Sequence, residues 1–244
     1  QPDREPLSAP AGDAVTRYSY SEALPHHGVT DAISIDHGMI LISASAPGTT
    51  GIAGPQPTYP AAYTATLDAS SKVAKITPLF YDESSATVAN EGAPKSDKAT
   101  TLALTDPDSN EIVPSGARDF MLTSQGDKEQ IYVDAPGTSH QTLSVLSLSQ
   151  SVDDTAWSTS TTGSLYSTDS TNNAVDLVSG TFTVGEPIVA VTPCGANGAP
   201  ATCPATGYPA DHLATMNANT GASTPVTMTV AGYVPQGGLA FVAK

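Results

Sequence analysis

The chain has 244 residues with 9 Lys or Arg against 24 Asp or Glu, so its formal net charge is −15. Such a negative field repels nucleic acid and anionic membrane surfaces, and no apolar run is long enough to span a bilayer. Only 14% of the residues are charged, while Ser, Thr, Ala and Gly are abundant, which is unlike a cytosolic enzyme and typical of an exported protein.

The N-terminal residues 1–13 are polar and rich in proline, and we expect them to form a flexible lead-in or tether. Their start, Gln-Pro-Asp-Arg, is interpreted as a mature N-terminus from which a signal peptide was removed. Residues 14–244 have a suitable length for a single domain with a sizeable core. The expected location is therefore secreted, periplasmic or on the cell surface.

Short segments with apolar residues at alternate positions follow one another along this domain, bounded by Gly, Pro, Asn, Asp and Ser. With 20 Pro and 20 Gly spread through the chain, a helix of several turns would be interrupted. Trp157 has the alternation of an inner strand and is expected in the core. The expected strands and hairpins include 31–45, 130–135, 142–148, 163–170, 174–180 and 187–193.

One part of the chain is repeated. Residues 30–71 align without a gap on residues 179–220, at a constant offset of 149 (179 minus 30). Tyr59-Pro60-Ala61 falls on Tyr208-Pro209-Ala210, and Asp68 falls on Asn217. Self-similarity at a fixed offset is the sequence signature of a repeat architecture.

Four turn residues divide this offset, because Asp68, Asp134, Asp169 and Asn217 each follow a short apolar strand. Their separations of 66, 35 and 48 residues correspond to three units of about 50, the length of a four-stranded propeller blade. The remainder would hold two more units. We therefore predict an all-β fold, a β-propeller of about five four-stranded blades, with another all-β repeat or a sandwich as the alternative.

Two details complete this prediction. An insertion between Asp82 and Asp97 is expected to account for the uneven spacing of the turns. The last strand, within residues 237–244, is expected to complete a blade that begins near residues 15–22, because ring closure satisfies open strand edges.

Two segments resemble the repeats of a known family of propellers: 163–180 (GSLYSTDSTNNAVDLVSG) and 212–226 (HLATMNANTGASTPV). The first resembles the strand, turn and strand repeat of the NHL and strictosidine-synthase-like propellers. The second resembles a blade hairpin of the same kind, although Asn217 stands where Asp is usual. Because these patterns recur in propellers of unrelated activity, the resemblance implies a fold and no reaction.

The two cysteines, Cys194 and Cys203, lie in one short loop rich in Gly, Pro and Ala. A disulfide between them is predicted, which would contribute about 2–3 kcal/mol and fits an oxidising compartment. A metal-binding thiol pair is the alternative, but zinc sites have closer spacing and nearby histidines.

Oxygen ligands alternate at Asp106, Asp108 and Asn110, as at the start of a calcium loop. The helix-loop-helix version is excluded because Glu111 stands where Gly is needed. A strand-linking calcium loop and a solvated acidic turn both remain open. The three neighbouring histidines His26, His27 and His37 lack any metal-binding spacing and are more simply interpreted as solvated turn residues.

Two functions are open, because no nucleophile elbow and no phosphate-binding loop is present. The first is a non-catalytic exported module that binds a protein, glycan or small molecule without a cofactor. Its recognition loops would be residues 46–58 and 195–207, which are followed by Tyr59 and Tyr208, and these two tyrosines are expected to pack their loops onto the blade face.

The second function is a metal-dependent hydrolase, lactonase or lyase with its site at the central channel. It requires acidic side chains to converge at the channel mouth. The candidates nearest to predicted inner-strand ends are Asp31, Asp36, Asp119, Asp153, Asp154 and Glu186.

Overall fold

The computed structural model describes residues 15–24, 29–45, 58–114, 119–192, 212–229, 233–235 and 237–244. These residues form eighteen β-strands and no helix, so this part of the chain contains no helix that could cross a membrane. The all-β class is thus confirmed. The cysteines Cys194 and Cys203, together with His26, His27, Tyr208 and nearly all of both expected recognition loops, lie outside the described residues.

The first sheet is a four-stranded antiparallel meander with one short parallel strand on its outer edge. Its innermost strand is β2. In spatial order the strands are β1 (Ser19–Tyr20), β5 (Val73–Tyr81), β4 (Pro60–Asp68), β3 (Met39–Ser45) and β2 (Val29–Asp36).

The second sheet repeats this plan with β8 innermost and two added strands, the first of them parallel to β11. The insertion expected between Asp82 and Asp97 supplies one of these added strands, β6, and the other, β7, follows directly after it. In order the strands are β7 (Ala99–Thr101), β6 (Ser85–Val88), β11 (Thr142–Ser147), β10 (Glu129–Asp134), β9 (Phe120–Ser124) and β8 (Pro107–Ile112).

The third and fourth sheets exchange strands along the chain. After β12 the chain forms a hairpin in the fourth sheet and then returns to the third sheet, before β18 completes the fourth. The third sheet has the order β12 (Val152–Trp157), β15 (Pro187–Val191), β16 (His212–Met216) and β17 (Ser223–Pro225), and the fourth β14 (Ala174–Thr181), β13 (Thr162–Asp169) and β18 (Leu239–Ala243).

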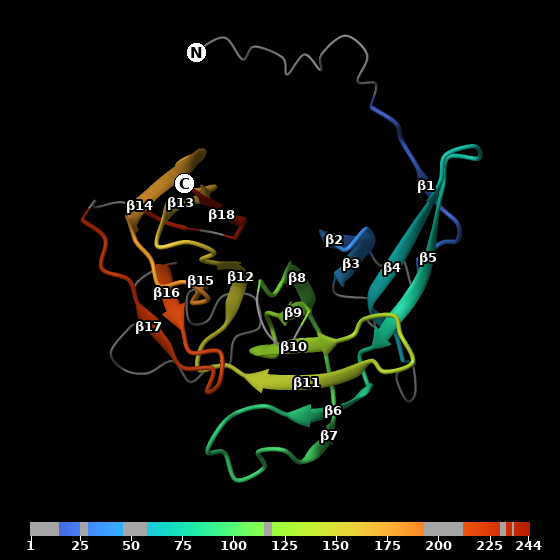
Figure 1. Cartoon of the computed structure of the whole chain (residues 1–244), viewed down its shortest axis with the longest axis horizontal. Coiled ribbons are helices and arrows are strands. Elements are labelled where there is room, and N and C mark those ends of the chain that lie inside the picture. The colour runs from blue at the N-terminus through green and yellow to red at the C-terminus, as the bar shows by residue number, and fades with distance from the viewer. Residues whose placement is uncertain are drawn as a thin grey trace.

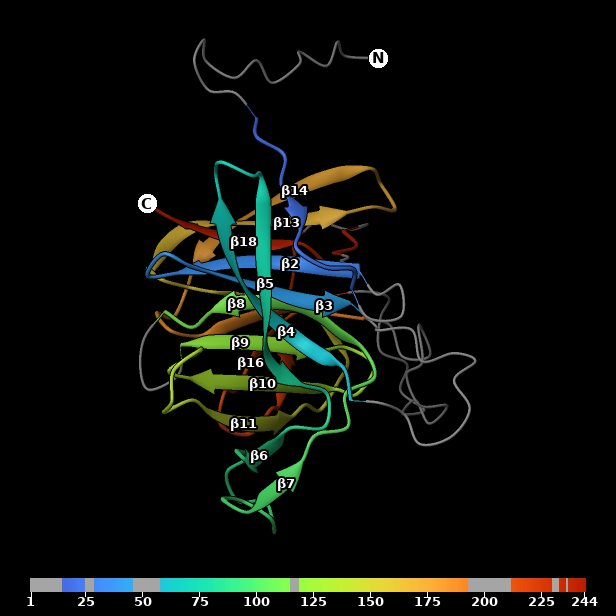
Figure 2. The same cartoon turned by 90° about the vertical axis from the view of Figure 1, so that its right-hand side faces the viewer.

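The four sheets stand side by side around a centre, as the blades of a propeller do (Figure 1). Figure 2 shows β2 and β3 of the first sheet beside β8 of the second. The ring predicted from the sequence is confirmed, with four sheets close to the expected five. An interval separates the fourth sheet from the first in Figure 1, and no strand pair of these two sheets makes more than marginal contact among the described residues.

The core lies between neighbouring sheets, because side chains alternate between the two faces of each strand. Leu122 of β9 is buried against Leu41 and Phe80 of the first sheet, whereas the adjacent Met121 is buried against Trp157 and Val189 of the third. A further cluster joins the third sheet to the fourth. The expected core position of Trp157 is therefore confirmed.

The sequence repeat corresponds to a structural one. In the first sheet Ile40 pairs with Ala65, and Ala65 pairs with Ile76. At the same offset of 149, Val189 pairs with Ala214, and Ala214 pairs with Pro225. The meander β3-β4-β5 is thus repeated in register by β15-β16-β17.

The repeat ends at the innermost strand. Of the residues that align with β2, those at 179–181 form the end of β14 and the others follow it, yet β14 belongs to the fourth sheet and β12 takes the place beside β15. Ring closure also differs from expectation, because β18 pairs with β13, whereas the N-terminal strand β1 pairs with β5. The prediction that both chain ends share one blade is therefore wrong. Instead, the N-terminal strand β1 joins the first sheet and the C-terminal strand β18 joins the fourth.

Candidate functional site

Three of the innermost strands carry a β-bulge at the same level, and each bulge contains an acidic residue. In β2 the register shifts between Thr30 and Ile33, around Asp31. In β8 it shifts between Pro107 and Asn110, around Asp108, and in β12 between Val152 and Thr155, around Asp153 and Asp154. A bulge re-aims the side chains of the extra residues, and bulges are common beside functional sites.

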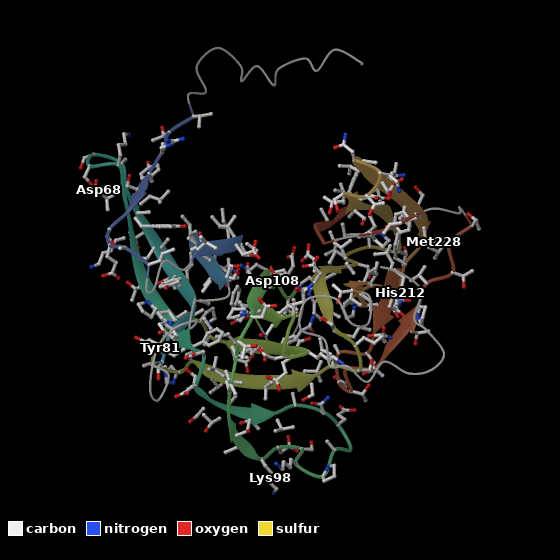
Figure 3. The ribbon with its side chains drawn as sticks, turned by 180° about the vertical axis from the view of Figure 1, so that it is seen from behind. Asp68, Tyr81, Lys98, Asp108, His212 and Met228 are labelled. Carbon is white, nitrogen blue, oxygen red and sulfur yellow. The ribbon has the colours of Figure 1, made fainter. Side chains whose placement is uncertain are left out.

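These bulges bring carboxyl groups from three sheets together at the centre. Asp108, labelled inside the ring in Figure 3, shares hydrogen bonds with the carboxyls of Asp31 and Asp153. Desolvation, then these hydrogen bonds and the neighbouring charges, raise the pKa of Asp108 far above its usual range. Asp108 therefore holds a proton at neutral pH, which lets three carboxyls occupy one place.

Three more carboxyls surround this group. Burial and the charge of Asp154 raise the pKa of Glu111 to about 7. Burial raises the pKa of Asp154 to about 6, against backbone hydrogen bonds that lower it. Burial and nearby acids also raise the pKa of Asp106. We call Asp31, Asp106, Asp108, Glu111, Asp153 and Asp154 the central carboxyl cluster.

Asn110 joins the first two sheets beside the cluster. Its Nδ2 donates to the Ala32 carbonyl at 2.8 Å and to Ser43 Oγ at 3.0 Å, while its Oδ1 accepts from Ser34 Oγ at 2.6 Å. Asn110 and Ser43 are both buried. Both amide hydrogens and one lone pair of the amide oxygen are thus used in bonds between the sheets.

The other sheets are joined around the cluster in the same manner. Ser109 Oγ donates to the Asp153 carbonyl at 2.6 Å, which connects the second and third sheets. The Leu239 amide of β18 donates to Asp154 Oδ2 at 2.6 Å, which connects the third and fourth. The cluster therefore sits on backbone that four sheets hold in place.

Protons reduce the negative charge of this cluster, since the pKa values of Asp106, Asp108, Glu111 and Asp154 are all raised. The ion pair found within the described residues lies elsewhere: it joins His37 to Asp36 at 2.6 Å, in the β2–β3 turn. Within the same residues, no three His, Cys, Asp or Glu side chains are already arranged as a metal-binding group. A bound cation would therefore have to replace protons and draw the carboxyls together.

Of the six acidic residues expected at the channel mouth, the structure brings three to the centre and places three elsewhere. Asp31, Asp153 and Asp154 do converge. Asp36 pairs with its neighbour His37, and Asp119 Oδ2 accepts from the Ala135 amide at 2.9 Å, which ties the start of β9 to the end of β10. Glu186 lies in the turn before β15, where its carbonyl accepts from Ser158 Oγ.

The segment for which a calcium loop and a solvated acidic turn were open is largely a strand instead. Pro107–Ile112 form β8, in which Asp108 joins the cluster and Asn110 serves the sheet contact. Sequence reasoning missed Glu111 as a member of the cluster. Only the bulge explains its position, and a bulge has no sequence signal here.

Tyr59 was expected near a recognition loop and to pack onto its blade. It is almost fully buried, and its amide donates to Asp82 Oδ1 at 2.8 Å. The Tyr59 side chain is thus part of the core and is not presented to a ligand.

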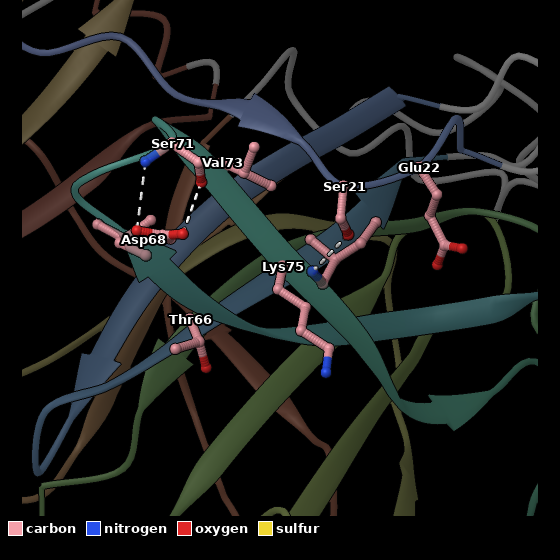
Figure 4. A pocket seen from close by; sticks show the side chains of 9 residues that line it. Ser21, Glu22, Thr66, Asp68, Ser71, Val73 and Lys75 are labelled. Atoms are coloured by element: carbon pink, nitrogen blue, oxygen red, sulfur yellow. Dashed lines mark hydrogen bonds between the residues drawn. The ribbon is translucent and has the colours of Figure 1, made fainter.

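Two open grooves of about 570 Å³ each occupy equivalent places in the repeat. One follows the β4–β5 hairpin (Figure 4), and the other follows the β16–β17 hairpin. In the first, the carboxylate of Asp68 already accepts bonds from the amides and hydroxyls of Ser70 and Ser71. The charged groups left to a ligand there are Glu22 and Lys75, so this groove is chemically weaker than the central carboxyl cluster.

Comparison with known protein families, with curated proteins and with solved structures finds no match to this chain. The fold and the site geometry therefore carry the functional argument.

Proposed function

We propose that the chain is an exported binding module that holds a cation at the central carboxyl cluster. The observation that carries this proposal is the convergence of six carboxyls at bulged strands of three sheets: four lie on the bulges and two, Asp106 and Glu111, flank one of them, and four of the six have raised pKa values. Like charges in a partly buried place destabilise a fold, and groups with strongly shifted pKa values concentrate at functional sites.

The ligand would be a divalent metal ion or an organic ammonium group, since both satisfy carboxylate oxygens. Calcium accepts six to eight oxygen ligands in flexible geometry, which suits carboxyls on several strands. Because the side chains are not preset for a metal, binding of either cation would displace the proton of Asp108. Affinity should therefore increase with pH.

The exported location rests on composition and on the disulfide predicted between Cys194 and Cys203. The relationship to NHL and strictosidine-synthase-like propellers rests on residues 163–180 and 212–226. The first segment is the hairpin β13–β14, and the second contains β16 and β17, so both occupy hairpins as that resemblance requires.

A metal-dependent or acid–base hydrolase or lyase is the second candidate. It is favoured by one specific observation: Asp154 and Glu111 have pKa values of about 6 and about 7, close to the range in which a general acid or base works best. Asp108 would supply a protonated carboxyl beside them.

Calorimetric titration with calcium chloride, and separately with 1,4-diaminobutane, tests the binding proposal and distinguishes the two sources of charge. We expect one of these probes to bind at one site per chain, and Asp108→Asn with Asp153→Asn to weaken it at least tenfold. Asp97→Asn, which removes one charge from an exposed turn, is the matched control. Absence of binding by both probes, at pH 6 and pH 9, would contradict the proposal.

A survey of nitrophenyl esters, glycosides and lactones, with and without calcium, tests the second candidate. Turnover by the wild type that is lost in Glu111→Gln and Asp154→Asn would support an enzyme. The rate of the wild type should then change between pH 6 and 7. Turnover that persists in both variants would exclude the cluster as a catalytic site.

A further inference from the structure

The fourth sheet ends in a long open strand. β14 (Ala174–Thr181) is paired with β13 on one side, and no described residue pairs with its other side. Most of its residues are exposed, including Val175 at 67% and Leu177 at 56%. An unpaired strand edge is a template for another strand.

The hydrogen-bond pattern shows which groups are open. The Phe182 amide donates to the Thr161 carbonyl, so residues 161 and 182 form a hydrogen-bonded pair next to Thr162 and Thr181. Such pairs recur at every second residue of an antiparallel ladder. The amides and carbonyls of alternate β14 residues therefore point to the free edge: Val175, Leu177, Ser179 and Thr181.

The other outer edges of the ring are protected. β1 has two residues and β7 and β17 have three each, and β17 includes Pro225. Short strands and proline are common means of blocking edge pairing. By contrast, β14 has eight residues without proline, lysine or a bulge.

The strand is also complementary to itself. In an antiparallel pair about a twofold axis at Val178, Val175 of one protomer lies opposite Thr181 of its partner, and Leu177 lies opposite Ser179. All four open residues then exchange hydrogen bonds, about eight in total. The one charged residue, Asp176, lies opposite Gly180, where no atom stands within 4 Å of an added Cβ.

The same register brings apolar side chains together. Val178 faces Val178 of the partner on the side of the third sheet, where it already packs in the core cluster. On the opposite side the two copies of Leu177 lie on a diagonal within contact distance for long side chains. We therefore propose that a second copy of this chain pairs with the first through β14, to form one continuous sheet from two fourth sheets.

Sedimentation velocity of the full chain at 10 to 300 µM tests this pairing. We expect a dimer that is strengthened by 0.5 M sodium chloride, since each copy carries a net charge of −15. Ser179→Pro removes one outward amide without removing a bond within the protomer, and it should weaken the dimer at least tenfold. Leu177→Lys should do the same if the proline variant does not fold.

Two control variants distinguish pairing at the strand edge from nonspecific hydrophobic association. Leu67→Lys changes another exposed leucine, at 46%, in the β4–β5 hairpin, and Tyr166→Lys changes the same face of the fourth sheet on its internal strand. Both should remain dimeric. Hydrogen exchange at Leu177 and Ser179 should slow as the concentration rises.

A chain that is monomeric at 300 µM in high salt would overturn the proposal. So would a dimer that survives both β14 substitutions, or one that Tyr166→Lys dissociates, because the latter result would indicate packing of sheet faces. If β14 pairs with a different protein instead, the purified chain should be a monomer. Hydrogen exchange at Leu177 and Ser179 should then slow only when that other protein is added, and this outcome too would overturn self-pairing.

Discussion

Lys72 and Gly221 occupy equivalent places in the repeat, 149 residues apart, and both have left-handed backbone, with φ of 58° and 72°. They close the hairpins β4–β5 and β16–β17. A Cβ on Gly221 would lie 2.1 Å from the Ser147 carbonyl oxygen, because this hairpin packs against the second sheet. The hairpin at Lys72 is exposed, so a side chain is accommodated there.

Gly221→Ala should therefore lower the free energy of unfolding by at least about 2 kcal/mol, from the left-handed backbone and the collision with Ser147. Gly180→Ala is the control, because nothing stands within 4 Å of its Cβ and its φ is not positive. It should change stability by less than about 0.5 kcal/mol. Urea unfolding of both variants measures the difference, and equal losses would contradict the collision.

Asn217 is predicted to hold its turn through its side chain. Its Oδ1 accepts from the amides of Asn219 at 2.9 Å and Thr220 at 3.0 Å, and Asp68 accepts from the amides of Ser70 and Ser71 in the same pattern. Asn217→Ala should cost about 1 kcal/mol in thermal or urea unfolding. Asn217→Asp should retain the turn at pH 7, and a loss as large as that of the alanine variant would contradict this role.

Acid should weaken the turn of the Asn217→Asp variant and the wild-type Asp68 turn alike. Hydrogen bonds from Ser70 and then Ser71 lower the pKa of Asp68. A lowered pKa in the folded state stabilises above the unfolded value near 4, and this stabilisation is lost as the pH falls further. Chemical-shift titration of the two carboxyls checks the direction, and Asp68→Asn removes the signal of the wild-type turn.

The central carboxyl cluster should make the protein less stable as the pH rises. A raised pKa in the folded state means that the folded chain binds more protons than the unfolded chain, so stability falls between the unfolded value near 4 and the folded value. Asp108→Asn keeps a donor to Asp31 and Asp153 but removes the titration. It should stabilise the protein by roughly 1–2 kcal/mol at pH 8 and by much less at pH 4.

Denaturant unfolding at the two pH values measures this effect. Asp97→Asn is the matched control and should show no such dependence on pH. Equal stabilities of wild type and Asp108→Asn at pH 8 would show that Asp108 is not forced to hold a proton.

Asn110→Ala should be more harmful than an ordinary polar substitution. It removes three hydrogen bonds between the first two sheets, one buried and two partly buried, and leaves their partners unsatisfied, at a cost of about 2–3 kcal/mol. Ser34→Ala removes one of these bonds and should cost about 1 kcal/mol. A double-mutant cycle between Asn110 and Ser34, followed by urea unfolding, should show a coupling, and strict additivity would argue against the bridge.

The sequence by itself determined the local structure. Alternation of apolar residues identified many of the strands, and turn residues marked one hairpin in each sheet, at Asp68, Asp134, Asp169 and Asn217. These features depend on neighbouring residues, so they can be read from a single chain. The repeat also predicted the pairing of β15, β16 and β17, because equal spacing of strands and turns produces equal register.

Only the tertiary structure decided which strands share a sheet and which acids meet. The alignment places the end of β14 on part of β2, yet β12 takes the position beside β15, since pairing between distant strands depends on packing of the whole ring rather than on local pattern. Asp31, Asp108 and Asp153 are far apart in the chain and meet because bulges re-aim them from three inner strands. A bulge arises where a strand must fit its neighbours, so it belongs to the assembled sheets rather than to the sequence of one strand.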